Sequence, residues 1–312
     1  MSDANPIKAG GVADAPTGNW IDRYAPDWFK PYARLARWDR LLPFWLLFWP
    51  CAFGLSLASL AGAGQGLPWR EALLMLIGSV IMRGAGCTFN DIADRDIDNK
   101  VARTRSRPIP SGQVSVKQAA AFMVILALLG LVILVQFNAA TIILGVLSLV
   151  LIAIYPFMKR VTWWPQAFLG LAFSYGALLG WSALTGGLSV VPLLLYFGCI
   201  LWVIGYDTIY ALQDIEDDAL IGVKSTARLF GARTRPIVGG FYAAAYLLWV
   251  LAAVLAGAGG LFVVLSLVSA AVLAWQVLTL DNSIAGNALT RFRANHLVGI
   301  ALTLALLADW VW

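Results

Sequence analysis

Charged residues are scarce in this sequence, and their scarcity indicates its class. Asp, Glu, Lys and Arg together make up only 12% of the 312 residues, and 60% are hydrophobic. Soluble domains carry about 25% charged residues, so a soluble globular protein is excluded. The composition predicts an all-α integral membrane protein whose helices form one bundle.

Cysteine and histidine are also rare. The three cysteines, Cys51, Cys87 and Cys199, are scattered through apolar segments, which argues against a disulfide framework and against cysteine metal sites. The single histidine, His296, begins the last apolar segment and is expected to be an interfacial residue. Residues 1–22 lack an apolar core, so we expect a flexible tail rather than a signal peptide. One transmembrane domain would then occupy residues 23–312.

Nine apolar segments are long enough to span a bilayer. An aromatic and basic stretch over residues 24–40 precedes them and predicts an interfacial helix. The expected spans are residues 41–61, 72–89, 118–136, 141–158, 164–184, 188–212, 237–257, 259–280 and 296–312. With a cytoplasmic N-terminus, every Lys and Arg except Arg70 and Arg83 falls in a cytoplasmic segment, as the positive-inside rule requires. The net charge of +5 therefore reflects basic loops and predicts no nucleic-acid partner.

An acidic motif ends the second span. At 100° per residue, Asn90, Asp94 and Asp98 fall on one helix face. Asp91 lies beside that face and Asp96 points away. Clustered carboxylates repel one another unless a cation binds, and oxygen ligands suit Mg²⁺. A basic run suited to phosphate follows, made of Lys100, Arg103, Arg105 and Arg107.

A second acidic cluster closes the sixth span. At helical spacing its five members share one face, and they are Asp207, Tyr210, Asp214, Asp217 and Asp218. Lys224 and Arg228 follow. Two such clusters facing each other would hold a metal-bridged diphosphate between them.

Ionisable groups also lie within the spans. Arg83 and Asp207 each stand seven residues before a motif residue, so they lie about 10 Å deeper in the membrane. Charge there is costly, which favours a functional role; the alternative is that the two simply pair with each other. Tyr155 and Lys159 share a face at the end of the fourth span. Lys159 could equally be a lysine that only sets topology.

These motifs resemble the signatures of the UbiA superfamily of membrane prenyltransferases. The first signature matches Met82–Cys87, Asn90, Asp91, Asp94, Asp98, Val101, Arg103, Thr104 and Arg107–Gly112. The second matches Tyr206–Ala211, Asp214, Asp217, Asp218, Gly222 and Lys224–Ala227. Tyr155 and Lys159 match its YxxxK element.

The resemblance implies a nine-helix bundle around a central cavity open to lipid. It also implies Mg²⁺-dependent transfer of a polyprenyl group from a polyprenyl diphosphate to 4-hydroxybenzoate, ortho to the hydroxyl, in ubiquinone biosynthesis. The membrane would be a bacterial inner membrane with the site facing the cytoplasm. Homogentisate, a dihydroxynaphthoate or haem are alternative acceptors.

The resemblance assigns roles to individual residues. Mg²⁺ would be held by Asn90, Asp91, Asp94, Asp98, Asp214, Asp217 and Asp218. The diphosphate would be gripped by Arg103, Arg107, Lys159 and Lys224, with Tyr155 and Tyr210 as further substrate contacts. Asp207 would orient or deprotonate the phenol, and Asp94 and Asp214 would be essential for turnover. Arg83 and Arg37 are candidates for the acceptor carboxylate, whereas Arg105 receives no role.

Other classes of protein fit the sequence less well. An ion-coupled transporter would place its ionisable sites near the bilayer midplane, whereas most charge here gathers at one face. A non-catalytic lipid-binding protein would not need every acidic position of both motifs. A CDP-alcohol phosphotransferase would need a further motif that this sequence lacks.

Overall fold

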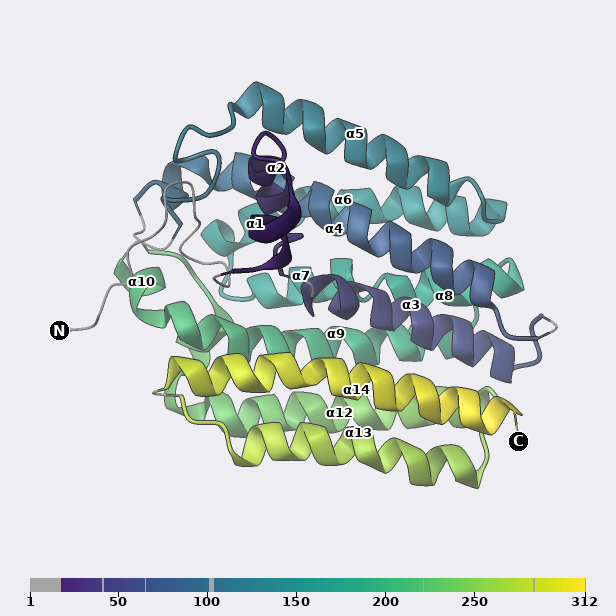
Figure 1. The fold of residues 1–312 in the computed structure, drawn as a ribbon. Helices are drawn as coiled ribbons and strands as arrows, with labels where there is room; N and C mark the ends of the chain where they lie inside the picture. Colours follow the sequence, from purple (N-terminus) through teal and green to yellow (C-terminus); the bar gives the residue numbers. More distant parts are fainter. Residues whose placement is uncertain are drawn as a thin grey trace. The chain divides into compact units, whose positions relative to one another are not determined.

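The structure is a computed structural model that describes residues 18–40, 42–64, 66–100, 104–220, 222–282 and 284–311 (Figure 1). Helices are the only regular elements among these residues, and nine stretches of them are long and apolar enough to cross a membrane. These stretches are α3 (Leu42–Leu60), α4 (Trp69–Asp98), α5 (Val116–Leu134), α6 (Ala139–Val161), the pair α7 (Pro165–Phe173) and α8 (Gly176–Thr185), α9 (Val190–Ala211), α11 (Thr226–Phe230) continuing through η2 (Gly231–Arg233) into α12 (Thr234–Leu255), α13 (Gly260–Leu278) and α14 (Ala285–Val311). The predictions of an all-helical fold and of about nine spans are confirmed.

The chain groups into two compact units. The first comprises Met1–Phe44 and Gly78–Val132, and the second comprises Trp45–Ile77 and Ile133–Trp312. The boundaries fall inside α3, α4 and α5. The single transmembrane domain, the central cavity and the cytoplasmic N-terminus stay predictions.

The segment before α3 differs from the expected single interfacial helix. It forms two short helices, α1 (Trp20–Tyr24) and α2 (Lys30–Leu35). They are separated because Pro26 forces the preceding Ala25 into an extended conformation, with φ −77° and ψ 142°. The expected tail over residues 1–22 lies mostly outside the described residues, and its last three residues belong to α1.

Two small hydrophobic clusters join α2, α4 and α5 within the first unit. One contains Leu35, Ile109, Val114 and Ala119, and therefore fixes the loop after α4 against the end of α2. The other contains Ala36, Ala85 and Leu126. The two clusters bring the α2 terminus and the loop after α4 to the helix that carries the first acidic motif.

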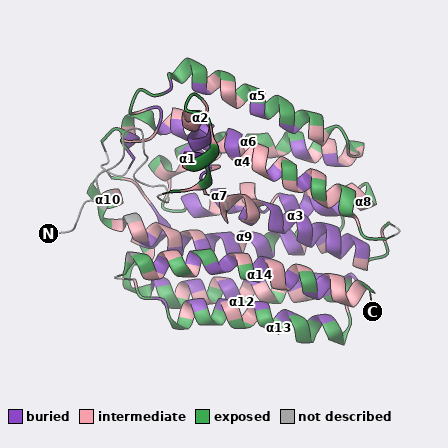
Figure 2. Ribbon diagram, in the orientation of Figure 1, coloured by how far each residue is buried: buried purple, intermediate pink, exposed green. Residues whose placement is uncertain are grey.

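Helix α9 forms the centre of the second unit. It lies alongside α12, α7 and α14, and α13 lies alongside α14 (Figure 1). Most of α9 is buried, whereas α13 is exposed along much of its length, as expected of a helix that faces lipid (Figure 2).

A buried polar network ties four helices of this unit together. Asn295 of α14 accepts a hydrogen bond from Trp202 Nε1 of α9 at 2.7 Å and donates one to Gln276 of α13 at 3.0 Å. The Tyr242 hydroxyl of α12 donates to Gln276 at 3.0 Å. Buried polar groups are stable in an apolar setting only when paired in this way.

The last span is longer than expected. Helix α14 begins at Ala285, so His296 lies inside the helix rather than at its start. Its Nδ1 accepts a hydrogen bond from Trp49 Nε1 at 3.2 Å. The span at residues 164–184 is interrupted at Ser174 and Tyr175, between α7 and α8.

Candidate functional site

The first acidic motif lies on the last turns of α4, which continues as one helix to Asp98. Asp91, Asp94 and Asp98 are 0%, 1% and 5% exposed, whereas the Asp96 side chain is 84% exposed. Asn90 is half-buried. The predicted division between an acidic inner face and an outward Asp96 is therefore confirmed, because an uninterrupted helix keeps its period of 3.6 residues.

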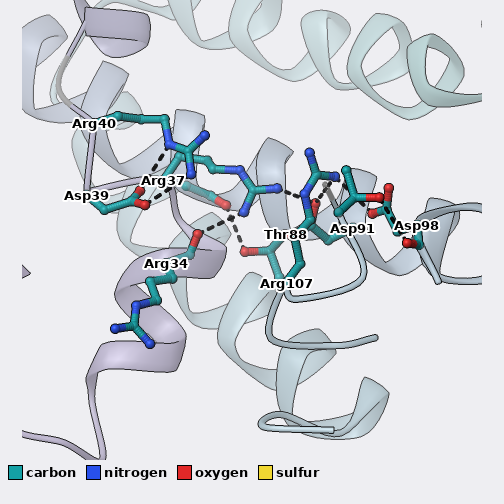
Figure 3. Close-up of polar contacts among 10 residues, drawn as sticks. Arg34, Arg37, Asp39, Arg40, Thr88, Asp91, Asp98 and Arg107 are labelled. Carbon is teal, nitrogen blue, oxygen red and sulfur yellow. Dashed lines mark hydrogen bonds and ion pairs between the residues drawn. The ribbon is translucent and has the colours of Figure 1, made fainter. Parts of the chain in front are cut away.

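Two arginines meet these carboxylates (Figure 3). Arg107 Nη1 donates to Asp98 Oδ2 at 2.9 Å and lies 3.5 Å from Asp91 Oδ1. Arg37 Nη2 donates to the same Asp91 Oδ1 at 2.7 Å. The structure therefore brings together four residues that the sequence singled out, from two separate segments. Arg103 lies outside the described residues, and Arg105 is exposed.

A hydrogen bond at the start of the loop after α4 helps to position Arg107. Thr104 Oγ1 donates to the backbone carbonyl of Asp98 at 2.9 Å, and Thr104 is 5% exposed. The sequence matched Thr104 to the first signature but gave it no role. Its hydrogen bond ties the loop back to the end of the acidic helix.

The acidic face fits a divalent cation. Among the described residues, Asp91 Oδ2 is buried without a hydrogen-bond partner, and two further carboxylates lie on the same face. Burying such an oxygen is costly unless a cation or donor meets it. Asn90, Asp91, Asp94 and Asp98 would be the holders. Within the described part of the chain, no three His, Cys, Asp or Glu side chains already converge on one ion position.

Helix α6 presents Tyr155 and Lys159 near its end, in the second unit. The backbone N–H of Lys224 donates to the Lys159 carbonyl at 3.0 Å, and Lys224 Nζ donates to the Val161 carbonyl at 3.0 Å. Tyr155, Lys159 and Lys224 are all half-buried. The structure therefore brings Lys159 and Lys224 together, although they come from different helical motifs.

Arg228 organises the loop that carries Lys224, a contact that the sequence did not reveal. Its guanidinium donates to the carbonyls of Asp218, at 3.3 Å, and of Val223. It also lies over the Trp163 ring, 5.3 Å from the centroid. The sequence placed Arg228 only in a basic loop, and no spacing rule links it to Trp163.

The second acidic motif departs from a regular helix. Helix α9 ends at Ala211 and continues as the 3-10 turn η1 (Leu212–Asp214) and then α10 (Ile215–Leu220). The single face expected from a continuous α-helix therefore applies only as far as Ala211. The side chains of Asp214 and Asp217 are not among those that the structure describes.

The remaining predicted site residues lie on α4 and α9. Asp207 and Tyr210 are half-buried, and the Tyr210 ring lies 4.6 Å from that of Phe292. Arg83 is half-buried on α4. The expectations that the two acidic clusters face each other, and that Arg83 or Asp207 meets the acceptor, stay predictions.

The fold and the acidic face of α4 define a polytopic helical membrane protein with a buried carboxylate site. Residues 47–299 match the UbiA prenyltransferase family, and the chain belongs to that family. The resemblance seen in the sequence is therefore confirmed.

Named relatives agree with this assignment. A protein named 4-hydroxybenzoate polyprenyltransferase, mitochondrial, from Arabidopsis thaliana is 43% identical over 90% of this chain and 69% of its own length. A protein of the same name from Drosophila melanogaster is 51% identical over 69% of this chain and 55% of its own length, so the match spans about half of that relative. A solved apo structure of a UbiA homolog from Aeropyrum pernix K1 has a TM-score of 0.70 and 27% identity, covering 84% of this chain and 97% of the homolog.

Proposed function

We propose that the protein transfers a polyprenyl group from a polyprenyl diphosphate to the ring carbon of 4-hydroxybenzoate ortho to the hydroxyl, with Mg²⁺ as cofactor, in ubiquinone biosynthesis. The observation that carries this proposal is the buried acidic face of α4, where Arg37 and Arg107 meet Asp91 and Asp98. The acceptor is inferred from the relatives, which are named for 4-hydroxybenzoate.

The donor side requires a site that accepts negative charge. When bound, Mg²⁺ supplies positive charge that stabilises the departing diphosphate. Lys159 and Lys224, whose backbones share a hydrogen bond, would add fixed positive charge for the phosphates, and so would Arg107 and Arg103. The bond between C1 of the prenyl chain and its oxygen breaks, and the diphosphate leaves with the electron pair.

The acceptor side requires an electron-rich ring carbon. Asp207 would take the phenolic proton, which raises the electron density at the ortho carbon. That carbon attacks C1, and the proton on the same carbon is then lost to the released diphosphate or to water, which restores the aromatic ring. The phenolate oxygen would regain its proton from Asp207. Arg83 on α4 is our first candidate for the acceptor carboxylate, and Tyr155 and Tyr210 are further contacts.

The protein is an integral membrane protein, as its family and the nine candidate spans among the described residues show. The relatives are named as mitochondrial, so they give no support to the expected bacterial inner membrane. We propose that the N-terminus and the basic loops share one face of the membrane, which would be the cytoplasmic face in a bacterium. Lipid and prenyl diphosphate would be the partners.

The test is prenyl transfer in membranes with radiolabelled 4-hydroxybenzoate, a long-chain polyprenyl diphosphate, and either Mg²⁺ or a chelator. We expect a lipid-soluble product that disappears with the chelator. Product with homogentisate or dihydroxynaphthoate instead would keep the fold and change the acceptor. No product with any aromatic acceptor would refute the proposal.

A matched pair of variants tests the metal site. Asp94→Ala removes a buried carboxylate from the acidic face, whereas Asp96→Ala removes an exposed carboxylate two residues later on the same helix. We expect Asp94→Ala to reduce turnover by more than the roughly 10–100-fold typical of losing a partner of a metal ligand. Asp96→Ala should be close to the parent protein. Equal activities would contradict the assignment.

A further inference from the structure

Helix α2 ends in an unusual turn. The N–H of Trp38 donates to the Ala33 carbonyl at 2.9 Å and the N–H of Arg37 donates to the Arg34 carbonyl at 3.1 Å, which is the Schellman pattern of a helix C-terminus. Glycine usually occupies the left-handed position of this motif. Here Arg37 occupies it with φ 57°, the only described non-glycine residue with positive φ. The left-handed backbone is unfavourable for a residue with a side chain.

The contacts of the Arg37 side chain explain why an arginine occupies this position. Arg37 is 9% exposed, and its Nη1 donates to the Arg34 carbonyl at 2.9 Å while its Nη2 donates to Asp91 Oδ1 at 2.7 Å (Figure 3). One end of the guanidinium is therefore fixed to the turn and the other to the acidic face of α4. A glycine would relieve the backbone strain but would lose both contacts.

The turn itself is docked on α4. Trp38 Nε1 donates to the Val80 carbonyl at 3.2 Å, and a Cβ on Gly84 would lie only 3.0 Å from the Ala36 Cβ. Trp20 Nε1 of α1 donates to the Trp38 carbonyl at 2.7 Å. Because the backbone on both sides of Arg37 is fixed, its guanidinium reaches Asp91 from one defined direction.

We propose that Arg37 is a positioning residue for the cation site: it holds Oδ1 of Asp91 and thereby keeps Oδ2 directed at the divalent cation. This inference rests on the proposed function, because it presupposes a cation on the acidic face. It is supported by the buried Asp91 Oδ2, which has no partner among the described residues. A carboxylate that binds metal is typically oriented by a hydrogen bond to its other oxygen.

Two other roles for Arg37 predict different results. If Arg37 only competes with a cation for the Asp91 carboxylate, its removal should tighten cation binding, because a competing charge is lost. If Arg37 binds the acceptor carboxylate, its removal should raise the KM for 4-hydroxybenzoate and leave cation affinity unchanged. The positioning role predicts weaker cation binding with an unchanged KM for the acceptor at saturating metal.

The experiment compares four variants of the full chain purified in detergent. Arg37→Asn removes the charge but keeps a residue that tolerates the left-handed conformation. Arg37→Lys keeps the positive charge but lacks the separate Nη1 and Nη2 donors of the guanidinium. Arg23→Gln is the control, since Arg23 is an exposed basic residue of the same segment. Asp91→Asn is the positive control for the cation site.

The measurement is Mn²⁺ binding followed by electron paramagnetic resonance in the presence of inorganic pyrophosphate, together with the KM for 4-hydroxybenzoate. We expect Arg37→Asn to weaken Mn²⁺ binding roughly 10–100-fold, with Arg37→Lys in between and Arg23→Gln unchanged. A merely structural defect would weaken Mn²⁺ binding and would also raise the KM for 4-hydroxybenzoate.

Three outcomes would overturn the inference. Mn²⁺ binding in Arg37→Asn within twofold of the parent, or tighter, would refute it if Asp91→Asn does weaken binding. A raised KM for 4-hydroxybenzoate with normal Mn²⁺ affinity would assign Arg37 to the acceptor. If Asp91→Asn also left Mn²⁺ affinity unchanged, the cation site of the proposed function would fail, and this inference with it.

Discussion

The ion pair between Arg107 and Asp98 gives the sharpest prediction about the stability of the site. Their atoms lie 2.9 Å apart, and the two side chains are 13% and 7% exposed. Arg107→Gln leaves the Asp98 carboxylate without this cation, whereas Asp91 keeps Arg37. Removing one partner of a buried pair costs roughly 3–5 kcal/mol, and the partial exposure of Arg107 favours the lower end, about 3 kcal/mol.

A double-mutant cycle separates the pair from its surroundings. Asp98→Asn should lower the free energy of unfolding by about 1 kcal/mol, because Arg107 still faces Asp91. The double variant should lower it by about 2 kcal/mol, because no charge is left unpaired. The single costs sum to about 4 kcal/mol, so the coupling energy should be about 2 kcal/mol.

The assay is unfolding of the metal-free protein in mixed detergent micelles with increasing dodecyl sulfate, followed by tryptophan fluorescence. Arg105→Gln is the control, because Arg105 is exposed two residues away and should change the free energy of unfolding by less than about 0.5 kcal/mol. Additive single costs would show that the pair is not coupled. Equal stabilities of Arg107→Gln and Arg105→Gln would refute the reasoning altogether.

Two predictions concern the second unit. Asn295→Leu leaves the indole N–H of buried Trp202 without its 2.7 Å acceptor, and we expect a loss of about 2 kcal/mol in the same unfolding assay; unchanged stability would show that the network contributes nothing. Arg228→Gln releases the carbonyls that frame the Lys224 loop, so the KM for prenyl diphosphate should rise about 10-fold while the KM for the acceptor stays constant. The exposed Arg233→Gln is the control, and an equal KM in both variants would remove the loop role.

Local periodicity made the acidic face of α4 predictable. A run of 30 helical residues keeps its phase, so the inward Asp91, Asp94 and Asp98 and the outward Asp96 follow from spacing alone. The same reasoning worked less well for residues 24–40, where aromatic and basic composition suggested one helix. Pro26 ended α1 instead, which the rule for the residue before proline would have indicated.

Contacts between distant segments were not predictable in this way. Nothing in the spacing links Arg37 to Asp91 or Arg228 to Trp163, because each pair is made by tertiary docking. The left-handed backbone of Arg37 was equally hidden, since the sequence marks such positions only when glycine or asparagine occupies them. For both arginines the positive charge could be read from the sequence, whereas the partner could be identified only from the fold.

The two arginines on the acidic face differ in how they are held, and this difference bears on the proposed reaction. Like-charged carboxylates on one helix face repel, and Arg37 and Arg107 neutralise part of that charge. Arg107 stands on the loop after α4, so binding a diphosphate would exchange one anionic partner for another and leave its charge paired. Arg37 stands on a docked turn whose backbone is strained for an arginine, and leaving Asp91 would lose the contact that offsets the strain. We therefore expect Arg107 to change partners during the reaction and Arg37 to remain on Asp91.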